Sequence, residues 1–255
     1  MGITLRSPFL VLVLSFLAMW LAALIGGYFR RREKDLREEV LQDRDVIVAA
    51  TLTLLGLIIG FSFSMAIERY SQRKNYEEAE ANAIGTEWVR ADLLPAADAA
   101  NVHKLLREYL NQRLLHYETQ GESDLQQIDR RTTELQSQLW FALRAPTTAQ
   151  PNAVSALILS GMNDVLNSQG YTQAAWWNRI PAGAWVLMLV IALSCNLLVG
   201  YCAHLARGGP VRFLVLPIIL SVAFFLIADI DSPRHGAIRV IPQNLISLAQ
   251  SLPTQ

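Results

Sequence analysis

The 255 residues carry no net charge, with 22 Lys plus Arg against 22 Asp plus Glu, and 52% of them are hydrophobic. Only 17% are charged, compared with about 25% in ordinary soluble domains. This composition excludes a disordered chain. Because no basic face or stripe is present, it also argues against a nucleic-acid partner.

The hydrophobic residues gather in four runs without a charge, at 7–29, 46–67, 180–206 and 213–228. A charge placed in lipid is costly, so runs of about this length are typical of helices that cross a membrane. We therefore expect an integral membrane protein whose partner is the lipid bilayer.

The first run is too long for the apolar part of a cleaved signal peptide, and Arg30, Arg31 and Arg32 follow it where a cleavage site would be needed. We expect it to remain as a membrane anchor. With the charged linker at 30–45 and the second run, it forms a first transmembrane pair, residues 1–67.

A polar segment at 68–179 separates the second run from the third. Its apolar residues recur at helical spacing, and no stretch alternates as a strand would. Ser123 and Gln126 have the spacing of a capping box that begins a helix, and Gly170 is placed to end another. This segment is predicted to be a helical extramembrane bundle.

The last two runs form a second transmembrane hairpin, residues 180–228, whose turn is Arg207-Gly-Gly-Pro210, and a C-terminal tail follows at 229–255. The predicted fold class is therefore an all-α integral membrane protein, with four transmembrane helices and a helical extramembrane bundle between the second and third. An even number of spans places both termini and the bundle on one side. Basic residues near the span ends are almost equally numerous on the two sides, so the positive-inside rule does not decide which side it is.

Enzyme signatures are missing from the sequence. The histidines His103, His116, His204 and His235 have no metal-ligand spacing. There is no glycine-rich phosphate loop and no Gly-x-Ser-x-Gly elbow. We expect no enzymatic activity, no metal site and no cofactor.

One helical face of the second run changes from apolar to polar along its length, through Leu57, Phe61, Ser64 and Glu68. A pore-lining helix has such a graded face, with a hydrophobic constriction near a charged mouth. Packing of Leu57 and Phe61 against neighbouring spans would give the same spacing, and spacing alone favours that packing interpretation.

Several motifs, taken together in this order, resemble the bestrophin-like family, a group of mostly bacterial membrane proteins. The resemblance covers the chain from about Val46 to Leu252. The motifs that carry it are Glu68-Arg-Tyr-Ser-Gln-Arg73, Glu80-Ala-Asn-Ala-Ile-Gly-Thr86, Arg90-Ala-Asp-Leu-Leu-Pro95, Leu106-Arg-Glu-Tyr109 with Arg113 and Tyr117, Asn178-Arg-Ile-Pro181, Val199-Gly-Tyr201 and Asp229-Ile-Asp-Ser-Pro-Arg-His-Gly236.

The family is named for its likeness to bestrophins, which are pentameric anion channels with four spans per subunit. The resemblance implies a homo-oligomer, a pentamer by family likeness, in the bacterial inner (cell) membrane, with the termini and the bundle in the cytoplasm. It also implies that the second span lines a pore and forms an apolar neck. The candidate pore-lining residues are Thr53, Leu57, Phe61, Ser64 and Glu68.

The sequence departs from the bestrophin pattern at two places. Bestrophins carry an acidic calcium-binding cluster after a Pro-Phe-Gly motif, whereas Arg234 and His235 follow Pro233 here. The arginine and asparagine that follow the neck phenylalanine in bestrophins are Ser62 and Ser64 in this chain.

The motif residues with a predicted structural role lie near the span ends, except Pro95, which would end the helical continuation of the second span. Pro233 would fix a turn and Gly236 would permit a tight bend, while Asp229 or Asp231 would pair with a basic group such as Arg69 or Arg239. The structural motif set is Arg69, Pro95, Pro181, Asp229, Asp231, Pro233 and Gly236.

Two function hypotheses follow. The first is a homo-oligomeric ion channel, for anions if the bestrophin likeness extends that far, with the second span lining the pore. The second is a non-conducting membrane scaffold or sensor whose helical bundle binds a partner.

Overall fold

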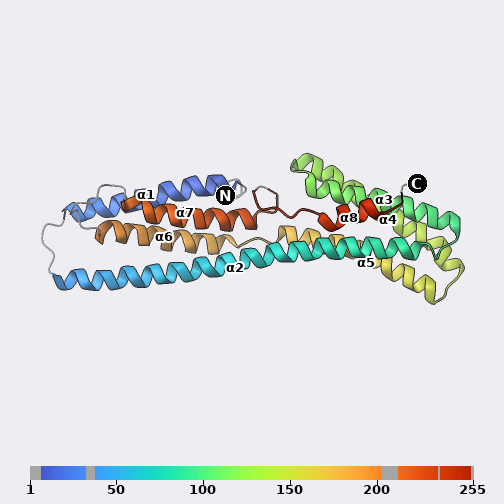
Figure 1. The fold of residues 1–255 in the computed structure, drawn as a ribbon, viewed down its shortest axis with the longest axis horizontal. Coiled ribbons are helices and arrows are strands. Elements are labelled where there is room, and N and C mark those ends of the chain that lie inside the picture. The colour runs from blue at the N-terminus through green and yellow to red at the C-terminus, as the bar shows by residue number, and fades with distance from the viewer. Residues whose placement is uncertain (1–6, 33–37, 203–211, 235, 254–255) are drawn as a thin grey trace. The chain divides into compact units, whose positions relative to one another are not determined.

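The computed structural model describes residues 7–32, 38–202, 212–234 and 236–253 (Figure 1). These residues form helices and no strand, which confirms the predicted all-α fold class. The helices are α1 (Pro8–Arg32), α2 (Glu38–Ala91), α3 (Ala96–Glu118), α4 (Glu122–Ala149), α5 (Ala153–Trp177), α6 (Ala182–Cys202), α7 (Arg212–Asp231) and α8 (Gln243–Ser251).

Four helical stretches are long and apolar enough to cross a membrane: Pro8–Arg30, Val46–Ala91, Ala153–Cys202 and Phe213–Asp231. Each overlaps one of the charge-free runs, so the prediction of four spans agrees with the structure. In α2 the charge-free run ends at Ile67, and the helix continues through charged residues to Ala91. The predicted hairpin turn at 207–210 lies outside the described residues.

The chain divides into two compact units, which we call the membrane unit (1–69 and 179–239) and the bundle unit (70–178 and 240–255). In the membrane unit, α1 packs against α6 and α7 (Figure 1). Glycines allow the backbones of α1 and α6 to touch, because a Cβ at Gly200 would lie 2.0 Å from the Ala23 carbonyl oxygen. Small residues at such crossings are the usual means of close helix packing in membranes.

The bundle unit has a hydrophobic core of its own. In it α3 packs against α4 and α8, and α4 packs against α5. Side chains at helical spacing on α2 and its neighbours meet in this core, as the apolar periodicity predicts. Fully buried members include Ile84, Leu106, Leu135, Leu139, Met162, Val165 and Leu245.

Two predicted helix boundaries are wrong. The capping box at Ser123 is absent: α4 begins at Glu122 after Gly121, and the Ser123 hydroxyl donates to the Asp124 carboxylate inside the first turn. Gly170 does not end α5, which continues to Trp177. A glycine inside a helix costs only about 1 kcal/mol relative to alanine, and the burial of Ala175 and Trp176 beyond it opposes that cost.

Candidate functional site

The five candidate pore-lining residues lie on one exposed face of α2. Within the membrane unit, Leu57 is 54% exposed and Phe61 is 63% exposed, and Thr53, Ser64 and Glu68 are exposed as well. The face is therefore not packed against the spans of its own subunit. The prediction that Leu57 and Phe61 share a face holds, while their role in a pore stays a prediction.

The opposite face of α2 is the one that packs. Leu55, Ser62 and Ala66 are buried. At 100° per residue these three lie within about 40° of one another. Measured around the same helix axis, the five candidate residues all lie within about 60° of the direction opposite to these buried residues. The span is thus two-sided, with one face against its own subunit and one face uncovered.

Two glycines extend the uncovered side. A Cβ at Gly56 or at Gly60 would meet no atom within 4 Å. Together with Ser64 they form a series of small residues four positions apart, which is the pattern that lets two membrane helices approach closely.

Arg69, at the end of the membrane unit's part of α2, pairs with a carboxylate at the end of α7. Its Nη1 lies 3.6 Å from the Asp231 Oδ1, so this ion pair suggested by the sequence is present. The same carboxylate accepts the Ile180 N–H at 3.1 and 3.2 Å, directly before Pro181 and the start of α6. One aspartate at the end of α7 therefore connects the start of α6 to the middle of α2.

Asp229 folds the segment after α7 back on itself. Its two carboxylate oxygens accept the N–H groups of Ala237 and Ile238, each at 2.8 Å. A Cβ at Gly236 would lie 2.4 Å from the Asp229 Oδ1, so only glycine lets the backbone approach this closely. Pro233 is buried in the turn between them. Arg239 donates to the Gly236 carbonyl oxygen and not to either aspartate.

The bundle part of α2 buries a stripe of charged side chains that the sequence did not lead us to predict. The Glu80 carboxylate pairs with Arg113 of α3, and neither side chain is exposed. Thr172 of α5 donates to the Glu80 Oε2 at 3.1 Å. Arg73 donates to the Ala175 carbonyl oxygen at 3.2 Å. These contacts join three helices through charged groups.

Glu77 holds the beginning of α8. Its Oε1 accepts the backbone N–H groups of Asn244 and Leu245, each at 2.9 Å, and its Oε2 accepts the Asn244 side-chain amide at 2.6 Å. A carboxylate at a helix N-terminus is stabilised by the free N–H groups and the helix dipole.

Glu87 is fully buried without a hydrogen bond to its carboxylate in the described part of the chain. Its Oε2 lies 4.0 Å from the Arg90 Nη1, and a Cβ at Gly161 of α5 would lie 2.0 Å from it. Burial raises the pKa of Glu87 to about 8, Arg90 lowers it in part, and Asp164 adds to the rise.

The described histidines have packing environments. His103 stacks on Trp88 with ring centroids 4.2 Å apart, and its Nε2 lies 2.9 Å from the Trp88 carbonyl oxygen. The His116 Nδ1 lies 3.2 Å from the Asp129 Oδ1. No group of three or more His, Cys, Asp or Glu side chains gathers as metal ligands within the described ranges.

The sequence profile described as "Bestrophin-like domain" matches residues 9–245. The chain belongs to the bestrophin-like family. The fold agrees with this: a bacterial bestrophin homologue from Klebsiella pneumoniae has a TM-score of 0.63 at 14% identity, with 96% of this chain and 99% of that chain covered. Another structure of that homologue, with a point substitution, has a TM-score of 0.66 at 13% identity, covering 94% and 98%.

A structure described only as a membrane protein is similar to the same degree, with a TM-score of 0.64, 14% identity, and 96% and 99% of the two chains covered. A comparison with curated proteins found no significant match. Family and fold together show a multi-pass membrane protein with a kind of fold that membrane ion channels use.

Proposed function

We propose that this protein is a homo-oligomeric membrane ion channel in which α2 lines the pore. The observation that carries the proposal is the uncovered face of α2, which runs from Leu57 and Phe61 to Ser64 and Glu68. Lipid is a poor environment for the polar end of this face, because polar and charged groups in hydrocarbon are costly. Copies of the chain around a common axis would surround a water-filled path with it.

The small residues beside this face support self-assembly through α2. Gly56 and Gly60 lie in open space in a single chain, and small residues four positions apart allow neighbouring membrane helices to pack closely. By family likeness the assembly is a pentamer in the bacterial inner membrane, with the termini and the bundle in the cytoplasm.

The same face suggests both a barrier and a filter. A Phe61 ring from each subunit would form an apolar constriction that resists wetting, and Leu57 one turn earlier would extend it. The bestrophin likeness implies anions. However, Glu68 repeated in each subunit would place a ring of carboxylates at the end of the path, and such rings are typical of cation channels. The reversal potential of the reconstituted channel in a KCl gradient would give the sign of the permeant ion.

Replacing Phe61 with alanine tests the pore assignment. We expect Phe61→Ala to raise the ion flux through purified protein in planar bilayers, because the apolar constriction widens. Phe63→Ala is the matched control, since Phe63 is 36% exposed and lies about 160° away around the helix. It should leave the flux unchanged.

Equal effects of the two substitutions would show that α2 does not line the path with this face. No current from the wild-type protein or from the Phe61→Ala variant, with the oligomer intact by light scattering, would instead favour the non-conducting scaffold or sensor.

A further inference from the structure

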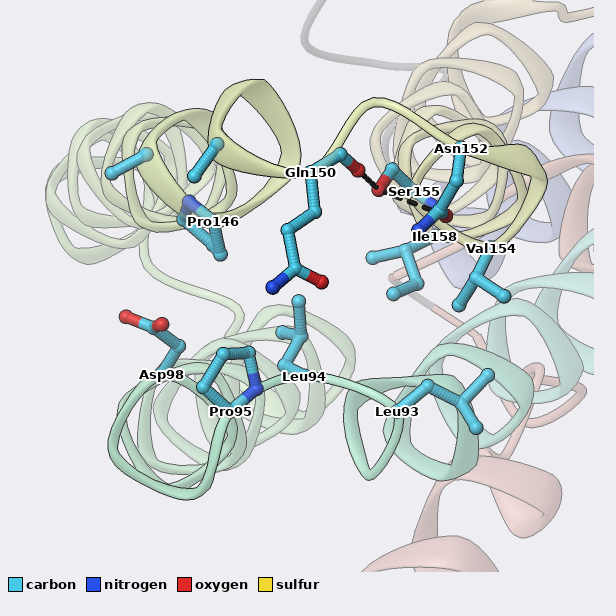
Figure 2. A pocket seen from close by; sticks show the side chains of 12 residues that line it. Leu93, Leu94, Pro95, Asp98, Pro146, Gln150, Asn152, Val154, Ser155 and Ile158 are labelled. Carbon is cyan, nitrogen blue, oxygen red and sulfur yellow. Dashed lines mark hydrogen bonds between the residues drawn. The ribbon is translucent and has the colours of Figure 1, made fainter.

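Two turns of the bundle unit border a cavity of about 310 Å³ that is open to solvent on one side (Figure 2). One wall is the turn from α2 to α3 and the other is the turn from α4 to α5. Its volume is at the lower end of the range for small-molecule sites, which is about 300–1,000 Å³. The lining residues are Leu93, Leu94, Pro95, Asp98, Ala145, Pro146, Ala149, Gln150, Asn152, Val154, Ser155 and Ile158.

Local structure holds both walls in place. Pro95 directly precedes α3 and has φ −52° and ψ 142°. This extended conformation separates α2 from α3, so the chain changes direction here. On the other wall, Asn152 caps α5 by accepting the Ser155 N–H at 2.9 Å. The Ser155 hydroxyl also donates to the Gln150 carbonyl oxygen. The cavity is therefore bounded by one turn that contains a proline and one turn that carries a side-chain cap.

The lining combines apolar and polar surface, and Asp98, Gln150, Asn152 and Ser155 stand beside its leucine, proline, valine and isoleucine side chains. Leu93 is 56% exposed and Val154 is also exposed, so the wall offers apolar surface that is still in contact with water. Asp98 is the only charged residue among the lining residues, and no basic side chain pairs with it within the part of the chain that the structure describes. In Figure 2 the Gln150 side chain extends between Pro146 and Leu94 into the opening.

We propose that this cavity binds a small amphipathic amine. The ammonium group would lie against the Asp98 carboxylate, and the hydrocarbon part would cover the leucine, proline and valine side chains. A neutral ligand of the same shape would leave the Asp98 charge without a counter-ion, and an anion would be repelled by it. The ligand would bridge the α2–α3 turn to the α4–α5 turn.

Calorimetric titration of the whole purified protein with phenethylamine tests this assignment, with phenethyl alcohol and phenylacetate as the neutral and anionic analogues. We expect binding of the amine in preference to both analogues. Asp98→Asn should weaken it by about fivefold, the effect of one partly exposed ion pair. Ala149→Trp, at an exposed lining position, should abolish binding by filling the cavity.

Two control variants separate the site from general effects. Asp124 lies in the first turn of α4 as Asp98 lies in the first turn of α3, so Asp124→Asn makes the same charge change at a helix start. Ala100→Trp adds the same ring at an exposed position of α3 outside the lining. Both should bind the amine like the wild-type protein.

The proposal is overturned if the amine does not bind at millimolar concentration, if either analogue binds as tightly, or if Asp98→Asn or Ala149→Trp binds like the wild-type protein. Calorimetry does not depend on ion conduction, so a failed channel assay would leave this result unaffected.

Discussion

Glu87 gives the bundle a pH dependence that one substitution should remove. The side chain is fully buried, and burial raises its pKa from the ordinary 4.5 to about 8. It lies in the bundle unit, beyond the charge-free run of α2. Replacing it with glutamine keeps the shape and removes the titration. We therefore expect Glu87→Gln to flatten the dependence of unfolding stability on pH.

The direction and size follow from proton linkage. Below pH 4.5 the folded and unfolded states both hold the proton, and the stability is complete. Between pH 4.5 and about 8 only the folded state keeps it, so the free energy of unfolding falls by about 1.4 kcal/mol per pH unit. Above about pH 8 both states are ionised and the loss is complete. From pH 5 to pH 8 the difference is about 3.5 kcal/mol.

The assay is thermal unfolding of the detergent-solubilised protein across pH 5–8.5. Other groups titrate in the same pH range and change the Tm of both proteins. The contribution of Glu87 is therefore obtained by subtracting the pH-dependent change in Tm of the variant from that of the wild-type protein. At about 2–4 °C per kcal/mol for a chain of this size, the two curves should separate by about 7–14 °C between pH 5 and pH 8.

A matched control lies on the same helix. Glu78 is exposed, so Glu78→Gln makes the same substitution at a carboxyl group that is not buried. It should leave the pH dependence of the unfolding stability as it is in the wild-type protein. If Glu87→Gln follows the wild-type curve throughout, the carboxylate is hydrated in solution and the reasoning from burial is wrong.

Three further predictions concern the membrane unit. Gly200→Ala should lower the Tm, because a Cβ there would lie 2.0 Å from the Ala23 carbonyl oxygen and overpacking costs about 1–3 kcal/mol; Gly183→Ala, where nothing lies within 4 Å, should not. Asp229→Asn together with Asp231→Asn should lower the Tm by weakening the contacts to Ile180, Ala237 and Ile238, and an unchanged Tm would discard this role. Reporters fused after Gln255 and inserted near Gly121 should give signals from the same side of the membrane, and opposite signals would remove the four-span topology.

The sequence predicts the four spans well because lipid excludes charge, which leaves long charge-free runs that no other environment requires. It also predicts the helices of the bundle, since apolar residues such as Ile84, Trp88 and Ala91 recur at helical spacing. It does not locate helix ends reliably. The Ser123 capping box and the Gly170 end are local signals, and tertiary packing overrides both.

The buried charges were missed for a different reason. Arg73, Glu77, Glu80 and Glu87 read locally as a solvated face, whereas they share one face of α2 with the buried Ile84. At 100° per residue these five lie within about 80° of one another. Charged residues at core spacing are a signal, but their partners cannot be read from it. Glu80 has two partners that are distant in sequence: Arg113 is 33 residues away and Thr172 is 92 residues away.

This placement of charge explains why the bundle would adopt one arrangement rather than several. An apolar stripe can be covered by any apolar surface, and a helix can then slide or rotate at little cost. A buried carboxylate restricts the helix to the one position in which its hydrogen-bond donors stay in place, since losing one partner of a buried pair costs about 3–5 kcal/mol. Glu77 requires the start of α8, and Glu80 requires Arg113 of α3. The bundle part of α2 therefore fixes which element lies beside it at successive turns, which apolar packing alone would not do.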